Sequence, residues 1–179
     1  MTEECATISQ KSSVFKIIFI GDEGVGKTSL VARYATSQFK TDYLPTLGAN
    51  VVAKEYSHEG RILTLLVWDI AGQEMFGQVR DKYYGGTSLA VLVYDITSRK
   101  TLGDTRVWLK DLRSSSTANI PLVLVGNKID LQNRNVSKEE GEKIAKEIGA
   151  NFLEASAKTG ENVRKIFDLV VKLLIDRYG

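Results

Sequence analysis

Eight residues that follow an apolar segment have the types and spacing needed to bind phosphate. The run Gly21-Asp22-Glu23-Gly24-Val25-Gly26-Lys27-Thr28 fits G-x-x-x-x-G-K-[ST], between a strand pattern and a helix pattern. Its glycines let backbone N–H groups turn toward phosphate oxygens, and the helix N-terminus adds partial positive charge. We expect Lys27 to reach the β- and γ-phosphates and the Thr28 hydroxyl to bind Mg²⁺. An ordinary glycine-rich turn would not require the Lys27-Thr28 pair at this offset.

The predicted phosphate contacts form one continuous stretch of chain. They are Glu23, Gly24, Val25, Gly26, Lys27, Thr28 and Ser29. This loop alone is compatible with an ATPase, a kinase or a GTPase, because all three classes use it. The nucleobase must therefore be identified from other residues.

A tetrapeptide further along the chain could recognise that base. Asn127-Lys128-Ile129-Asp130 follows the apolar strand pattern of residues 121–126. The Asp130 carboxylate can accept two parallel hydrogen bonds from guanine N1–H and N2–H₂, whereas adenine would leave it desolvated and unpaired. Lys128 can lay its aliphatic stem along the purine, and the Asn127 amide can bond either the base or a neighbouring loop. These residues favour guanine.

The next strand pattern, residues 151–154, ends in a second tetrapeptide of the same kind. In Ala155-Ser156-Ala157-Lys158 the Ala157 backbone N–H can donate to guanine O6, and Ser156 and Lys158 complete the predicted base site. Either tetrapeptide by itself could be a solvated turn. Because both occur in order behind a phosphate loop, we interpret them as one guanine-binding site.

Alternating strands and helices must position these loops. Strand patterns cover residues 14–20, 49–56, 62–69, 89–94, 121–126 and 151–154, and helix patterns cover residues 27–36, 81–84, 101–113, 137–148 and 161–178. The turn at Glu59-Gly60 predicts one antiparallel hairpin, and the other strands predict βαβ units. Ser137 and Glu140 predict a capping box, and Gly149 a helix end. We expect an α/β fold with a six-stranded, mostly parallel sheet, one antiparallel strand and five helices on both faces.

Composition limits the classes of function. The 179 residues are 43% hydrophobic, which suits one domain, expected at 14–179 after a flexible extension at 1–13. A net charge of +2 does not indicate nucleic-acid binding. Cys5, the single cysteine, allows no internal disulfide, and no apolar run approaches the roughly 18 residues that span a bilayer. His58, the one histidine, lies in a predicted solvated turn, which argues against histidine-dependent catalysis.

Together the motifs resemble those of the Ras superfamily of small GTPases, and most of all the Rab branch. The resemblance spans residues 14–178 and rests on GDEGVGKTS, YLPT followed by Gly48, WDIAGQE, KYYGG, YDIT, GNKID and SAK. It implies a P-loop G domain that binds GTP or GDP with Mg²⁺ and hydrolyses GTP slowly. It also implies protein effectors, an exchange factor and an activating protein, in membrane-traffic-like or signalling processes.

The resemblance assigns roles in a first switch loop. Thr46 is expected to reach Mg²⁺ through its hydroxyl and the γ-phosphate through its backbone N–H. Phe39 matches the aromatic residue that packs on the guanine edge, and Tyr43 matches the residue that folds over the phosphates. These assignments make the first loop sensitive to the γ-phosphate.

A second switch loop follows the predicted strand at residues 62–69. By the resemblance, Asp69 holds Mg²⁺ through water, Gly72 bonds the γ-phosphate and Gln73 orients the attacking water. A hard cation prefers oxygen ligands and retained water, and glycine allows close backbone approach, which agrees with these roles. The implied catalytic set is therefore Gln73, Lys27, Thr46 and Gly72.

Three features depart from the Rab pattern. Leu47-Gly48-Ala49-Asn50-Val51 stands where Rabs carry an acidic residue and then phenylalanine, so Rab partners do not transfer directly. Glu23 stands where relatives carry glycine or serine. The printed chain ends at Gly179 without a cysteine for prenylation. We expect a cytoplasmic protein, and leave peripheral membrane association open for a full-length form.

Two other classes of function compete with a hydrolysing switch. One is a binding module that holds guanine nucleotide and recruits partners without useful hydrolysis; Gln73 and Thr46 favour the switch. The other is a P-loop kinase for a small metabolite. That alternative lacks a domain for a second substrate and leaves the segment Asn127–Asp130 unexplained.

Overall fold

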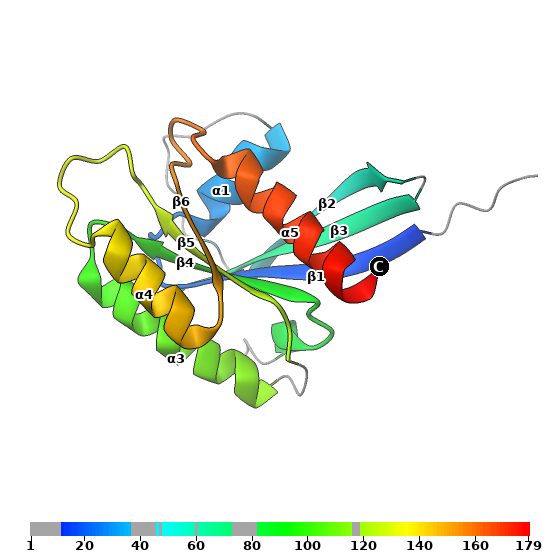
Figure 1. The fold of residues 1–179 in the computed structure, drawn as a ribbon, viewed down its shortest axis with the longest axis horizontal. Coiled ribbons are helices and arrows are strands. Elements are labelled where there is room, and N and C mark those ends of the chain that lie inside the picture. The colour runs from blue at the N-terminus through cyan, green and yellow to red at the C-terminus, as the bar shows by residue number, and fades with distance from the viewer. Residues whose placement is uncertain (1–11, 37–45, 47, 60, 73–81, 116–118) are drawn as a thin grey trace, which may run out of the picture.

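The protein folds around one central sheet, seen in a computed structural model that describes residues 12–36, 46, 48–59, 61–72, 82–115 and 119–179 (Figure 1). The strands are β1 (Ser12–Ile20), β2 (Ala49–His58), β3 (Arg61–Ile70), β4 (Leu89–Asp95), β5 (Leu122–Asn127) and β6 (Asn151–Ala155). Their order is β2-β3-β1-β4-β5-β6, and only the β2–β3 pair is antiparallel. The predicted fold class is confirmed.

Helices cover both faces of this sheet. They are α1 (Lys27–Thr36), α3 (Arg99–Ser115), α4 (Lys138–Ile148) and α5 (Val163–Tyr178), and residues 82–84 add a short helical segment. Helices α1 and α5 lie on one face, and α3 and α4 on the other (Figure 1). None of the helices in the described ranges is both long and apolar enough to cross a bilayer.

The core forms two layers because successive side chains of a strand point to opposite faces. In β1, Ile17 and Phe19 pack in the layer under α1 and α5, whereas Ile18 and Ile20 pack in the layer under α3 and α4. Every residue of β4 and β5 is buried, as expected for parallel strands covered on both sides. This rigid centre fixes the positions of the loops that leave its carboxyl edge.

Local sequence signals set several element boundaries. The predicted capping box is confirmed: Ser137 Oγ accepts from the Glu140 N–H at 3.2 Å, and Glu140 Oε2 accepts from the Ser137 N–H at 2.8 Å. Gly149 ends α4 with a left-handed φ of 74°. Helix α5 begins at Val163, two residues later than predicted, because Asn162 has a left-handed φ of 57°.

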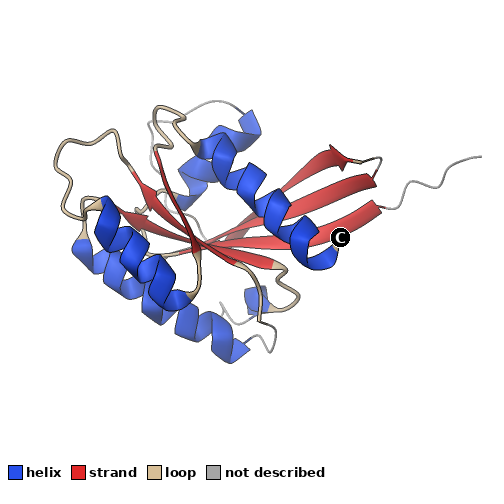
Figure 2. Cartoon of the chain, in the orientation of Figure 1, coloured by secondary structure: helices blue, strands red, loops and turns tan. Residues whose placement is uncertain are grey.

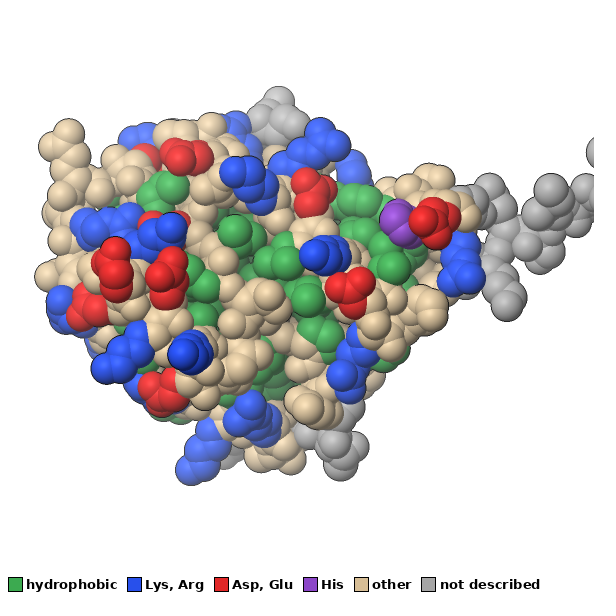
Figure 3. Space-filling view, in the orientation of Figure 1, with side chains coloured by type: hydrophobic (Ala, Val, Ile, Leu, Met, Phe, Trp, Pro, Cys, Tyr) green, Lys and Arg blue, Asp and Glu red, His purple; other side chains and the backbone are tan. Residues whose placement is uncertain are grey.

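On the face drawn in Figure 3, basic and acidic side chains are interspersed, and its described residues form no large area of a single charge. His58, the one histidine, ends β2 and is exposed. The loops after β1, β5 and β6, in contrast, gather at one end of the sheet (Figure 2). Those of the predicted nucleotide residues that the structure describes lie at that end.

Candidate nucleotide-binding site

The loop between β1 and α1 depends on two glycines at close approaches. Gly21 has a φ of 142°, and a Cβ on it would lie 2.2 Å from the Val93 carbonyl oxygen. Gly26 has a φ of 98°, and a Cβ on it would lie 2.2 Å from Asn127 Nδ2. Both positions exclude a larger residue on steric grounds. The Gly26 carbonyl then accepts from the Leu30 N–H at 2.9 Å, which starts α1.

Lys27 is held against this loop by two backbone carbonyls. Lys27 is only 5% exposed. Its Nζ donates to Gly21 O at 2.7 Å and to Asp22 O at 2.8 Å. A buried ammonium requires such acceptors, because desolvating an unpaired charge is costly. The positive charge is thereby positioned over the loop that the sequence assigns to phosphate.

Three predicted Mg²⁺ ligands from three separate segments meet beside Lys27. The Thr28 hydroxyl donates to Asp69 Oδ2 at 2.5 Å, and the Thr28 and Thr46 hydroxyl oxygens lie 2.7 Å apart. Thr46 Oγ1 lies 3.4 Å from the same carboxylate oxygen. Hydroxyl and carboxylate oxygens are the hard donors that Mg²⁺ prefers.

One oxygen of the Asp69 carboxylate lacks a hydrogen bond from the described residues. Asp69 is 1% exposed, and its Oδ1 has no hydrogen-bond partner among the described residues. Burial raises the pKa of this carboxyl, while the hydrogen bond from Thr28 and the charge of Lys27 act in the opposite direction. A buried carboxylate oxygen without a donor is a costly arrangement that a cation or its bound water would relieve. The donor set therefore fits the predicted metal.

Gly72 packs directly on the phosphate loop. A Cβ on Gly72 would lie 2.4 Å from the Asp22 carbonyl carbon and 2.4 Å from the Glu23 nitrogen. The preceding Ala71 N–H donates to Gly48 O at 2.9 Å, which joins the end of β3 to the residues before β2. Only glycine allows this approach. Glu23 is exposed.

Asn127 connects the loops predicted to hold phosphate and base. It is 1% exposed; its Nδ2 donates to Val25 O at 2.8 Å, and its Oδ1 accepts from the Ala157 N–H at 3.1 Å. Of the two roles open to this amide, contact with neighbouring loops is the one present here. A guanine O6 would have to share or replace the bond now made by the Ala157 N–H.

Asp130 and Lys128 are held by partners outside their own tetrapeptide. Asp130 Oδ1 accepts from the Ser156 hydroxyl at 2.6 Å, and Lys158 Nζ lies 4.0 Å from Oδ2. Lys128 has a φ of 74°, and its Nζ lies 2.5 Å from Asp95 Oδ2 at the end of β4. Sequence reasoning missed Asp95, although its place at the end of the strand beside β5 was a usable signal.

Comparison with known proteins decides the family. A family model described as the Ras family matches residues 16–176. The chain belongs to the Ras family. Ras-related protein SEC4 of Saccharomyces cerevisiae is 38% identical over 165 residues, covering 92% of this chain and 77% of that protein. Ras-related protein Rab-13 of Bos taurus is 38% identical over 167 residues, covering 93% of this chain and 82% of that protein.

These relatives confirm the predicted Rab-like resemblance. The chain is a small GTPase of the P-loop class, and its partners in general are guanine nucleotides and proteins that read or regulate the nucleotide state. Three residues that the resemblance assigns lie outside the described part of this Ras-family chain: Phe39, Tyr43 and Gln73. Their roles stay predictions.

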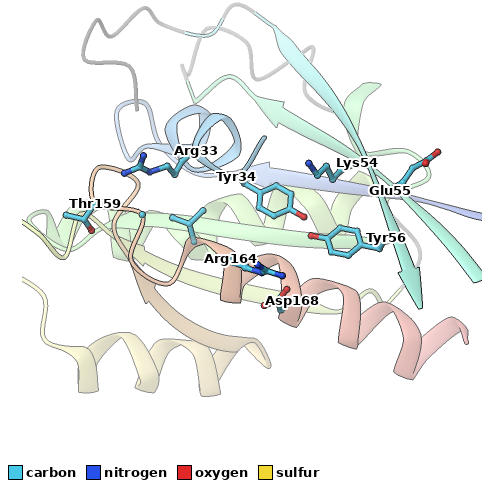
Figure 4. Close-up of a pocket in the computed structure, with 10 residues that line it drawn as sticks. Arg33, Tyr34, Lys54, Glu55, Tyr56, Thr159, Arg164 and Asp168 are labelled. Atoms are coloured by element: carbon cyan, nitrogen blue, oxygen red, sulfur yellow. The ribbon is translucent and has the colours of Figure 1, made fainter. Parts of the chain in front are cut away.

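A hollow lies beside the base loop of this Ras-family domain. It has a volume of about 570 Å³ and is lined by side chains from α1, β2 and α5, among them Tyr34, Lys54 and Asp168 (Figure 4). At its rim, Arg33 Nη2 donates to the Lys158 carbonyl at 2.6 Å. Sequence reasoning missed Arg33 because the contact joins residues 125 positions apart. Helix α1 thus contacts the base loop through Arg33.

Proposed function

We propose that this small GTPase binds GTP or GDP together with Mg²⁺, hydrolyses GTP to GDP and phosphate, and signals through the loops around Thr46 and Gly72. The observation that carries the proposal is the meeting of Thr28, Thr46 and Asp69 beside the buried Lys27. Oxygen donors next to a fixed ammonium suit a metal-bound triphosphate. We further propose that residues 14–179 form the G domain and residues 1–13 an extension.

In this proposal the chain contributes positioning and charge. Backbone N–H groups from Glu23 to Ser29 and the Lys27 ammonium bind the phosphate oxygens, with the phosphate-loop geometry held by Gly21 and Gly26. Thr28, Thr46 and Asp69 would hold Mg²⁺, which would supply positive charge against the β- and γ-phosphates. Gln73 orients the attacking water, as the family resemblance implies.

Guanine is selected at the other end of the site. Asp130 accepts from the N1–H and N2–H₂ groups of guanine, Lys128 covers the purine face, and Ala157 donates to O6. Support comes from the network that fixes these residues, since Ser156 holds Asp130 and Asp95 holds Lys128. Phe39 and Tyr43 complete the site by resemblance.

The nucleotide state is read through two γ-phosphate contacts, the backbone N–H groups of Thr46 and Gly72. Gly72 already lies against the phosphate loop, so a γ-phosphate there would be in reach of its backbone. Residues 37–47 contain no arginine, so we propose that an activating protein supplies one. We place the protein in the cytoplasm, at a membrane surface if a full-length form carries an anchor.

Single-turnover phosphate release from GTP-loaded protein tests the proposal. The expected result is slow release by the isolated wild-type chain and no measurable release by Gln73→Leu, with GTP still bound tightly by both. Tight GTP binding without release by the wild type would instead support a binding module. Equal affinity for ATP and GTP would overturn the assignment of Asp130.

A further inference from the structure

A hydrogen bond between two side chains joins helix α3 to the phosphate loop. Trp108 Nε1 donates to Asp22 Oδ1 at 2.7 Å, across 86 positions of sequence. Trp108 is 5% exposed, and the Asp22 side chain is 18% exposed. A hydrogen bond to a carboxylate in a mostly buried setting is stronger than one between neutral groups. The pair therefore forms a specific connection and not an incidental surface contact.

Asp22 transmits this contact to the residues that face the phosphates. The Asp22 side-chain carboxylate contacts α3, whereas the Asp22 backbone carbonyl oxygen accepts from Lys27 Nζ at 2.8 Å. The same peptide unit is the surface on which Gly72 packs, with a Cβ on Gly72 placed 2.4 Å from the Asp22 carbonyl carbon. The orientation of a single peptide thus sets the positions of Lys27 and Gly72 together.

The negative charge of the Asp22 carboxylate would repel a polyphosphate, so contacts that keep this side chain on α3 favour nucleotide binding. Lys100 Nζ lies 3.5 Å from Asp22 Oδ2 and also pairs with Asp104 on the same helix. Burial raises the pKa of the Asp22 carboxyl, and the hydrogen bond from Trp108 opposes that effect. A carboxylate released from these partners would stand near a polyphosphate and repel it.

We propose that Trp108 is a positioning residue which, through Asp22, holds the phosphate loop in the orientation that seats Lys27 and Gly72 on the γ-phosphate. The inference rests on the proposed function, because it assumes that this loop binds GTP. Helix α3 then influences the affinity for GTP more than the affinity for GDP, because Gly72 contacts only the γ-phosphate in the proposed site.

The test compares the nucleotide affinities of variants at Trp108 and Asp22 and of the double variant. Trp108→Phe keeps an aromatic ring but removes the N–H donor, and we expect the affinity for a non-hydrolysable GTP analogue to fall about fivefold relative to GDP. Asp22→Ala should have the same effect, and the double variant should add nothing further. Asp22→Asn keeps an acceptor oxygen for the indole and should restore at least half of the loss.

A spectroscopic arm uses the fact that the chain has two tryptophans. Trp68→Phe leaves Trp108 as the sole indole and is the matched control, because Trp68 Nε1 has no hydrogen-bond partner among the described residues. The replacement keeps a ring beneath Lys16, whose Nζ lies 4.4 Å from the Trp68 ring centroid. Trp108 emission should change when the GTP analogue replaces GDP, and Asp22→Ala should remove that change.

The outcomes separate this inference from the proposed function. A wild type that binds no guanine nucleotide overturns the proposed function. A wild type that binds both nucleotides, with a GTP-to-GDP affinity ratio unaltered by Trp108→Phe and Asp22→Ala, overturns the inference alone. If Trp108→Phe fails to fold, the comparison of Asp22→Ala with Asp22→Asn decides, and equal ratios for these two variants contradict the positioning role.

Discussion

The Asn127 side-chain amide lies 2.8 Å from the Val25 carbonyl oxygen, joining residues 102 positions apart at the centre of the proposed site. The other end of the amide accepts from the Ala157 N–H. Both polar ends are therefore used inside the protein. One buried side chain connects the phosphate loop, the strand end of β5 and the loop after β6.

Removing this connection should affect both stability and binding. Asn127→Ala leaves a buried carbonyl and a buried N–H without partners, so we expect the free energy of unfolding to fall by about 2 kcal/mol. Release of GDP should be more than tenfold faster, which corresponds to a change of about 1.4 kcal/mol in binding free energy. Urea unfolding and stopped-flow nucleotide release measure the two effects. Asn133→Ala, at an exposed position of the following loop, is the control and should change neither.

Asp130→Ala should abolish discrimination between guanine and adenine nucleotides. Two hydrogen bonds to a charged carboxylate are lost, which weakens GDP and GTP binding by about 3 kcal/mol or more. Competition titrations with GDP, GTP and ATP measure the effect. The exposed carboxylate variant Glu142→Ala should bind like the wild type. Retained selectivity for guanine in Asp130→Ala would show that base recognition lies elsewhere.

Glu23 places a carboxylate at the phosphate loop, at a position where the family resemblance implies a small residue. Its backbone nitrogen lies against Gly72, so its side chain begins close to the proposed γ-phosphate site. At about 4 Å and an effective dielectric near 20, repulsion of an anion is at most roughly 4 kcal/mol, which Mg²⁺, Lys27 and water reduce. We expect Glu23→Gln to raise the GTP-to-GDP affinity ratio more than about twofold, or ~0.4 kcal/mol.

A second substitution separates charge from size at the same position. Glu23→Gly removes both, and the single-turnover hydrolysis rate shows whether bulk near the reacting phosphate matters. Changes below about twofold in both variants, for both measurements, would mean that the exposed Glu23 side chain influences neither nucleotide affinity nor hydrolysis.

The capping box of α4 allows a prediction about stability alone. Ser137→Ala removes the acceptor for the Glu140 N–H and should lower the free energy of unfolding by about 1 kcal/mol. Ser137→Thr keeps a hydroxyl and should retain most of that stability. Chemical denaturation measures both variants, and nucleotide affinity should not change in either. Equal stability of the two variants would contradict a capping role.

Sequence periodicity was sufficient to predict the sheet and the convergence of its loops. The carboxyl ends of parallel strands meet at one edge, so Lys27, Asp69 and Asn127 could be expected near one another before any coordinates. The predicted role of Gly72 came from the family resemblance, and the structure adds that Gly72 packs on the phosphate loop, where a Cβ would clash.

Contacts between side chains and elements that are distant in the sequence could not be predicted from it. Nothing local to Trp108 indicates that its indole bonds Asp22, and nothing local to Arg33 indicates the Lys158 carbonyl. The start of α5 was missed for a similar reason. Asn162 donates from Nδ2 to Glu154 O at 2.9 Å, and this tertiary contact accompanies a backbone that cannot be helical.

The contact of Arg33 with the Lys158 carbonyl has a consequence for how long a loaded protein stays loaded. In the proposed site the base lies against the loop that carries Lys158, and Arg33 of α1 donates to that loop beside the hollow. Two Ras-family proteins with identical nucleotide contacts can therefore have different exchange half-lives if they differ at Arg33 alone. In the proposed site Arg33 is not a nucleotide ligand, so we expect the lifetime of the loaded state to depend in part on a residue outside the set of nucleotide contacts.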